Sequence, residues 1–309
     1  MASGAPRSKT FERPLIVGVL GYLQLLPRAT GLRVLNDKTS AGKAAGEQEG
    51  DLSAALRRSM TTLYGRHLSE DGTQLDYGGM AASEEYAGYK ALAEGLREVD
   101  TRSMGEEERV AFFINVYNCL VIDAIISLGE PKDLLSRLRM YAEAAYNIGG
   151  ANFSLNDIEN GVLRGNQSPP TINPFAQKPF GEGDARAGIA CKKPDPRIHF
   201  ALNCGARGCP PIRFYRGEEL DAMLDKAARS FCKSIEVDQD KGVVYMSQIF
   251  KWYENDFQSD STDKPPVSTL RFVEKYLDED KKDALSRFLE SGKVPELKFQ
   301  PYDWGLNSK

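Results

Sequence analysis

Residues 195–215, with the sequence DPRIHFALNCGARGCPPIRFY, gather the side chains that are best suited to chemistry. The stretch contains His199, one of two histidines in the chain, together with Cys204 and Cys209, two of its five cysteines. A cysteine attacks a carbonyl carbon as its thiolate, and a neighbouring imidazole can accept the thiol proton. The same residue types also bind zinc or form a redox pair. Four interpretations follow, namely catalysis, metal binding, thiol redox chemistry and a structural loop.

The leading interpretation is a cysteine-dependent hydrolase or acyltransferase that acts on an amide, a peptide or a thioester. Cys204 is the expected nucleophile, because Gly205 directly after it permits a tight turn whose backbone amides could hold an oxyanion. His199 is the expected base. Either Asn118 or Asn115 would then orient the imidazole ring.

The spacing of His199 and Cys204 prevents a simple pairing. The segment RIHFALN is typical of a strand, and residues five apart on a strand point to opposite faces. The two side chains therefore meet only if the strand ends or bulges between them. The site also needs the earlier helix that carries Asn115 and Asn118. Glu159 is a further catalytic candidate if it faces His199.

Four residues are candidates for substrate binding, namely Arg197, Arg213, Tyr117 and Cys209. The planar fork of an arginine suits a carboxylate or a phosphate. The alternative for the two arginines is that they anchor the loop through salt bridges. The expected substrate is a small molecule or a peptide, and this interpretation needs no cofactor.

The other interpretations use the same residues differently. Zinc is the alternative cofactor, with Cys191, His199, Cys204 and Cys209 as ligands, although their spacing lacks the C-x2-C pair of standard zinc knuckles. In the redox interpretation, Cys204 and Cys209 enclose four residues and could close a disulfide, while Arg207 favours a thiolate nearby. In the last interpretation the cysteines are small buried residues of a non-catalytic scaffold or protein-interaction domain.

An apolar helix ending near Leu128 is the element expected to position the site. It is apolar on all sides, which predicts a central buried helix, and Gly129 and Pro131 end it. Asn115 and Asn118 are three residues apart and share one helix face. Their amides either tie the helix to neighbouring backbone or orient a catalytic group.

Short hairpins accompany this helix, one around the Gly149–Gly150 pair and one in the segment IEVDQDKGVVYM. The mixture predicts an α+β fold, namely a helix-rich single domain with a central buried helix and a small antiparallel sheet, distantly papain- or transglutaminase-like. We place this domain at residues 51–309. Residues 1–50 form a separate leader and linker segment.

Composition limits the classes of partner. The net charge is −4, which gives no broad basic surface, so we expect no nucleic acid. Basic residues precede an apolar run at 15–26, which is too short for an ordinary membrane-spanning helix but resembles a targeting leader. Five cysteines are too few for a disulfide scaffold, so we expect a cytoplasmic protein without a stable membrane span. The alternative is a secretory or organellar location, if residues 1–30 are a leader.

Four motifs, FFINVYNCLVIDAI, SLNDIENGVLRG, DPRIHFALNCGARGCPPIRFY and SQIFKWYENDF, occur in order along the chain. They resemble the family known as domain of unknown function 547, over about residues 51–305. This resemblance implies candidate positions without a settled reaction. The family usually has a serine before the second cysteine, where this chain has Gly208, which argues against a role for a hydroxyl there.

Overall fold

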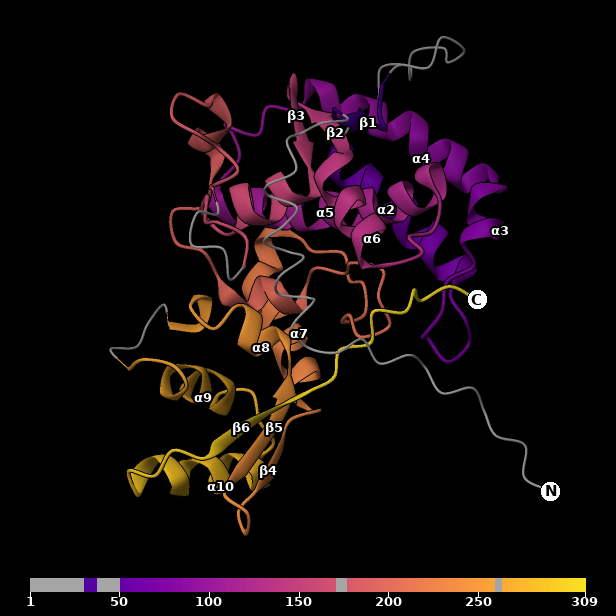
Figure 1. The fold of residues 1–309 in the computed structure, drawn as a ribbon. Helices are drawn as coiled ribbons and strands as arrows, with labels where there is room; N and C mark the ends of the chain where they lie inside the picture. Colours follow the sequence, from indigo (N-terminus) through magenta and orange to yellow (C-terminus); the bar gives the residue numbers. More distant parts are fainter. Residues whose placement is uncertain (1–30, 38–50, 171–176, 259–262) are drawn as a thin grey trace, which may run out of the picture.

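The computed structural model describes residues 31–37, 51–170, 177–258 and 263–309 (Figure 1). The apolar run at 15–26 and the predicted linker at 38–50 lie outside these residues. The α+β prediction is confirmed, and the strands form two small sheets of three strands each. Both sheets are mixed, because one strand adds in parallel to an antiparallel hairpin in each.

The first core surrounds one long helix. Its elements in chain order are β1 (Arg33–Val34), α2 (Leu52–His67), α3 (Tyr77–Ala81), α4 (Glu84–Glu94), α5 (Glu106–Leu128), α6 (Leu134–Glu143), β2 (Ala144–Ile148) and β3 (Ala151–Ser154). Strands β2 and β3 form the predicted hairpin, whose turn Gly149–Gly150 has positive φ at both residues. Strand β1 pairs with β2 in parallel, so part of the predicted leader and linker segment joins this sheet.

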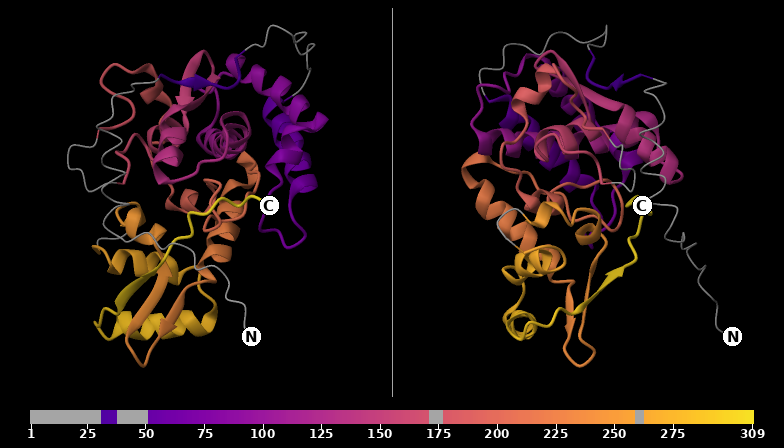
Figure 2. Two further views of the ribbon diagram at one scale, coloured as in Figure 1. Left: turned by 45° about the vertical axis from the view of Figure 1, so that its right-hand side comes forward. Right: turned by 60° about the vertical axis from the view of Figure 1, so that its left-hand side comes forward.

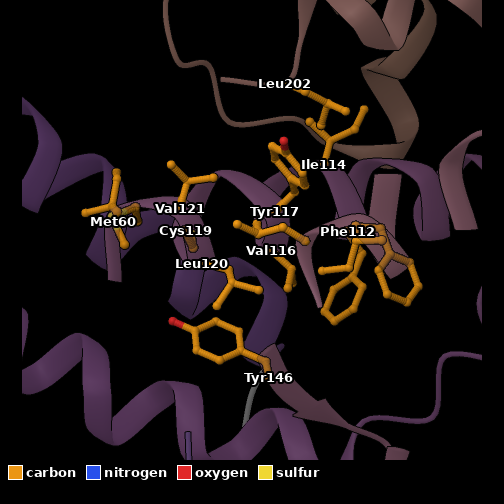
Figure 3. Packing of buried hydrophobic residues seen from close by; sticks show 14 of the residues in the cluster. Met60, Phe112, Ile114, Val116, Tyr117, Cys119, Leu120, Val121, Tyr146 and Leu202 are labelled. Atoms are coloured by element: carbon orange, nitrogen blue, oxygen red, sulfur yellow. The ribbon is translucent and has the colours of Figure 1, made fainter. Parts of the chain in front are cut away.

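Helix α5 is the predicted central helix, and every residue from Ala111 to Ile125 is buried. Figure 3 shows Phe112, Val116 and Leu120 of this helix packed among Met60 and Tyr146 from its neighbours. Among the described residues, α5 is the one helix long and apolar enough to cross a membrane, yet 89% of its most apolar window is buried inside the protein. That burial is typical of a core helix.

A second core lies below the first in Figure 1 and contains Phe200 and buried residues from Ala227 to Leu285. Its elements are α7 (Leu220–Cys232), β4 (Glu236–Asp238), β5 (Val243–Ser247), α8 (Ile249–Trp252), α9 (Val267–Glu274), α10 (Glu279–Glu290) and β6 (Glu296–Gln300). Strands β4 and β5 are the second predicted hairpin, and β6 pairs with β5 in parallel. Phe200, Phe250 and Phe257 stack in this core.

The last residues return from the second core to the first, as both views in Figure 2 show. After β6 the chain forms a bridge between Leu306 and Ala206, and another between Ser308 and Leu75. The hydroxyl of Tyr77 donates to Asn307 Oδ1 at 2.8 Å. The end of the chain therefore lies against the loop that contains Cys204 and Cys209.

The prediction of a strand at RIHFALN is wrong, because residues Pro196–Phe200 form a 3-10 helix, η4. The ring of Pro196 fixes φ at the first helical position, which favours the start of a helix. The Asp195 carboxylate accepts a hydrogen bond from the backbone N–H of Arg197 and caps the turn. The argument from strand alternation therefore does not apply to His199.

The one buried carboxylate within α5 organises its neighbours. Asp123 is fully buried and accepts hydrogen bonds from Tyr86 Oη at 2.6 Å, Tyr146 Oη at 2.7 Å and Ser127 Oγ at 2.7 Å. Its other partner is Lys90 Nζ at 2.7 Å. Four donors satisfy this carboxylate, which makes its burial tolerable.

We predict that Asp123→Ala lowers the free energy of unfolding by about 3–5 kcal/mol, because Lys90 and three hydroxyls lose their shared partner. Urea unfolding measured by far-UV circular dichroism checks this. Glu107→Ala, in the exposed first turn of the same helix, is the matched control and should cost less than about 1 kcal/mol. Equal losses for the two variants would contradict the prediction.

Candidate active site

The sulfurs of Cys204 and Cys209 are 2.9 Å apart, and both cysteines are free and half-buried. The turn between them brings them together, since the N–H of Cys209 donates to the carbonyl of Ala206 at 3.0 Å. Gly205 has φ of +77°, and a Cβ there would lie 2.8 Å from Ile125 Cδ1. Only glycine therefore fits this position, because of both its backbone conformation and its packing.

Two asparagine side chains fix the start of the loop. Asn118 on α5 donates to the carbonyl of Ala201 at 3.0 Å and accepts from the N–H of Asn203 at 2.9 Å. Asn203 in turn accepts from the N–H of Gly205 at 2.8 Å and donates to the carbonyl of Pro210 at 2.7 Å. The loop is thus held at both ends by buried amides.

Helix α6 contributes a cation and a phenol to the site. Arg137 Nη1 and Tyr141 Oη donate to the carbonyl of Cys204 at 2.8 and 3.0 Å. Arg137 Nη2 donates to the carbonyl of Trp304 at 2.9 Å, and the arginine is only 2% exposed. A buried guanidinium therefore lies beside the thiols, where it favours negative charge.

The two thiols differ in acidity. The hydrogen bond from Cys209 lowers the pKa of the Cys204 thiol to about 6, and the charge of Arg137 acts in the same direction against the effect of burial. Burial raises the pKa of Cys209 well above its ordinary value, and the negative charge of Cys204 adds to this shift. The pair therefore loses its first proton more readily than an ordinary cysteine, and the charge of Arg137 favours the thiolate at Cys204.

The other three cysteines are buried thiols. Burial raises the pKa of Cys119 to about 12, that of Cys191 to about 11 and that of Cys232 to about 12. Desolvated thiols of this kind are poor nucleophiles, because the thiolate is the reactive form. Among the five cysteines of the chain, Cys204 is the one whose thiol pKa is lowered.

The structure does not bring His199 to a cysteine. Its Nε2 lies 2.7 Å from Asp256 Oδ2, and its ring stacks on that of Tyr253 with centroids 3.8 Å apart. Asp256 also accepts two hydrogen bonds from Arg164, at 2.6 and 2.8 Å. Although burial opposes ionisation, Arg164 and His199 hold the pKa of Asp256 well below its ordinary value. His199 therefore belongs to a buried ion-paired cluster.

Glu159 is joined to this cluster through Tyr253. Its carboxylate accepts hydrogen bonds from Tyr253 Oη at 2.6 Å and Tyr117 Oη at 3.2 Å. Burial raises the pKa of Tyr117 well above its ordinary value, and the charges of Glu159 and Cys204 both add to the shift. Tyr117, buried in α5, is therefore electrostatically coupled to both groups of residues. Glu159 reaches His199 only through the ring of Tyr253.

The remaining predicted residues have structural partners. Asn115 donates to the carbonyl and accepts from the N–H of Tyr215, so both helix asparagines bind backbone. Arg197 forms ion pairs with Asp195, Asp221 and Asp225. It therefore anchors the loop through salt bridges, which was the alternative to substrate binding.

Two further candidates lie apart from the sulfur pair. The charge of Arg213 lowers the pKa of Tyr215, against the larger effect of burial. Cys191 is buried beside Val162, and its backbone N–H donates to the Val162 carbonyl at 2.9 Å. In the part of the chain that the structure describes, no three His, Cys, Asp or Glu side chains are grouped closely enough to hold a metal ion. The four residues of the zinc alternative therefore do not form one site.

Sequence reasoning missed the partners that act on the predicted residues. Arg137, Tyr141 and Tyr302 surround the thiols, and Asp256 and Arg164 surround His199. Most of these contacts join residues far apart in the chain, so no local spacing indicates them. Asp256 had a local signal, because it lies within the motif SQIFKWYENDF, three residues after the Tyr253 that stacks on His199.

We predict that the rate of alkylation of Cys204 by iodoacetamide reaches half its plateau near pH 6. The thiolate fraction rises with pH, and the lowered pKa moves this rise about 2.5 pH units below that of an ordinary cysteine. In Cys209→Ala the hydrogen-bond donor is lost, so the midpoint should move up toward about 8.5. Peptide mass spectrometry of the labelled protein measures both rates.

Cys191→Ala is the control for this experiment, since it removes a buried thiol away from the sulfur pair. It should leave the midpoint at Cys204 unchanged. A midpoint near 8.5 in the unmodified protein would contradict the prediction.

Comparisons with known proteins give one match. No curated protein and no solved structure matches the chain. A family model described as "Protein of unknown function, DUF547" matches residues 101–232. This segment contains α5, His199 and the sulfur pair, but not Asp256 or Tyr302. The predicted resemblance to the DUF547 family is thereby confirmed for residues 101–232, a shorter segment than the predicted 51–305.

Proposed function

We propose that this protein is a thiol–disulfide oxidoreductase, with Cys204 as the attacking thiolate and Cys209 as the resolving thiol. The observation that carries the proposal is the 2.9 Å separation of the two sulfurs within a fixed turn. A disulfide needs a separation of about 2.05 Å, so a small movement of the side chains closes the bond. The low pKa of Cys204 supports the same assignment.

The reaction follows from the difference between the two thiols. The Cys204 thiolate attacks one sulfur of a substrate disulfide, forms a mixed disulfide and releases the other sulfur as a thiolate. Cys209 loses its proton to solvent and attacks Cys204 Sγ, which breaks the mixed disulfide and releases the second substrate thiolate. The substrate disulfide gains two electrons and leaves as two thiolates, and the protein pair becomes a disulfide as the Cys209 proton passes to solvent. A small thiol such as glutathione reverses this oxidation.

The expected cysteine–histidine acyl chemistry has less support. A histidine base must lie within hydrogen-bond distance of the thiol that it activates. Within the described residues, His199 bonds to Asp256 and to no sulfur. The Cys204 sulfur instead lies against the Cys209 thiol, and Arg137 and Tyr141 donate hydrogen bonds to the backbone carbonyl of Cys204. These groups stabilise a thiolate without a histidine, which suits exchange between sulfurs. Reversible exchange is also consistent with the predicted cytoplasmic location.

A test uses the chromogenic disulfide DTNB in a stopped-flow experiment. Attack by Cys204 releases one coloured thiolate, and resolution by Cys209 releases a second, so we expect about two equivalents in the burst. Cys209→Ser should release about one equivalent and keep the other as a mixed disulfide visible by mass spectrometry. Cys204→Ser should lose the burst, because the remaining thiols are protonated.

The control variant is Cys191→Ala, which should keep the full burst. A Cys204→Ser burst equal to that of the unmodified protein would contradict the proposed function. A burst of only one equivalent from the unmodified protein would also contradict it, since Cys209 would then not resolve the intermediate.

A further inference from the structure

Tyr302 places its hydroxyl against the sulfur pair. Its Oη lies 3.2 Å from Cys209 Sγ and 3.9 Å from Cys204 Sγ. We infer that Tyr302 is a catalytic residue of the resolving step, in which its hydroxyl donates a hydrogen bond to the Cys209 sulfur and stabilises the attacking thiolate. This inference rests on the proposed function and assigns a role to a residue that the proposed reaction does not otherwise need.

The direction of the hydrogen bond follows from which group carries a proton. Burial raises the pKa of Tyr302 well above its ordinary value, and the two cysteine sulfurs add to the shift. The phenol therefore keeps its proton at neutral pH and cannot serve as a base. Once Cys209 has lost its proton, the sulfur is an acceptor only, so Tyr302 must be the donor.

The resolving step is where such a donor is needed. Burial is the largest cause of the raised pKa of Cys209, and the charge of Cys204 is a further cause. Formation of the mixed disulfide removes the charge of Cys204, but burial still opposes the Cys209 thiolate. A hydrogen bond from Tyr302 offsets part of that penalty. The shorter distance to Cys209 fits a role in resolution, whereas the first attack uses Cys204.

The structure fixes Tyr302 in this position. Its ring packs against Trp252 and Trp304, with centroid distances of 5.2 and 4.8 Å, and the two tryptophan rings also contact each other. The backbone that follows Tyr302 pairs with the thiol loop. Gly208 N–H donates to the carbonyl of Asp303 at 3.0 Å, and the next hydrogen bond joins the loop to Gly305 at 2.8 Å.

Gly208 provides the room that the phenol needs. A Cβ at this position would lie 3.1 Å from two carbon atoms of the Tyr302 ring and 3.2 Å from the backbone nitrogen of Asp303. These contacts are tighter than ordinary van der Waals contacts, so any larger residue would push the ring aside. A glycine at 208 and a tyrosine at 302 therefore act together. The missing side chain of Gly208 leaves space for the Tyr302 ring, and the Tyr302 hydroxyl then lies within hydrogen-bond distance of Cys209 Sγ.

The experiment separates the two releases of thiolate from DTNB in Tyr302→Phe. The first phase should keep its rate to within about twofold, and the second should slow by about tenfold or more, as expected for a lost hydrogen bond to a charged acceptor. The pH midpoint of the second phase should move upward, because the Cys209 thiolate becomes harder to form. A purely structural role for Tyr302 would not move this midpoint.

Two variants complete the design. Gly208→Ala keeps the phenol but displaces its ring, so it should also slow the second phase and leave the first unchanged. Tyr276→Phe removes a phenol that donates to Asp225 and has no contact with either sulfur among the described residues, so it should leave both phases unchanged. Urea unfolding midpoints show whether each variant folds, and Gly208→Ala decides the question if Tyr302→Phe does not.

The outcomes distinguish this inference from the proposed function. If the unmodified protein lacks a second phase, the proposed function fails. If the unmodified protein has both phases and the folded Tyr302→Phe variant resolves at the same rate and pH midpoint, the role of Tyr302 is overturned while the proposed function stands.

Discussion

The contact between the sulfurs of Cys204 and Cys209, 2.9 Å apart, is the feature on which the rest of the site depends. A flexible six-residue loop would separate two thiols for most of the time, because closing it has an entropic cost. Here the loop is held by the amide of Asn118 on the buried helix α5, and by the close approach of Gly205 to the same helix. The central helix therefore fixes the distance between two sulfurs that lie some eighty residues later in the chain.

The charges of the site are separated into two groups. Arg137 lies beside the thiols and favours a negative sulfur, whereas Arg164 is fully engaged with Asp256 and neutralises the cluster around His199. Tyr117 lies between the groups and donates to Glu159. Within the described residues Arg137 binds two backbone carbonyls and no carboxylate, and its buried charge is a physical reason for the Cys204 thiolate. The cluster around His199 instead ties η4 to the segment after α8.

The local elements could be predicted from the sequence, whereas the contacts between them could not. The apolar pattern of α5 and the paired glycines of the β2–β3 turn are local signals, and both elements form as expected. The 3-10 helix at His199 was mistaken for a strand, because RIHFALN has an apolar composition while Asp195 and Pro196 direct the backbone into a turn. The partner of Cys209 is 93 residues away at Tyr302, and such a contact depends on how the last strand returns to the first core.

The central claim is that Cys204 and Cys209 exchange reversibly between dithiol and disulfide. The most direct measurement is a redox titration in glutathione buffers, in which the fraction of the disulfide is counted by alkylation and intact-protein mass spectrometry. The account predicts a midpoint between about −270 and −120 mV, the range of enzymes that exchange disulfides. A pair that stays oxidised below about −300 mV would be a structural disulfide, and a pair that never forms the bond would be a packed corner of the fold. Either result would contradict the account.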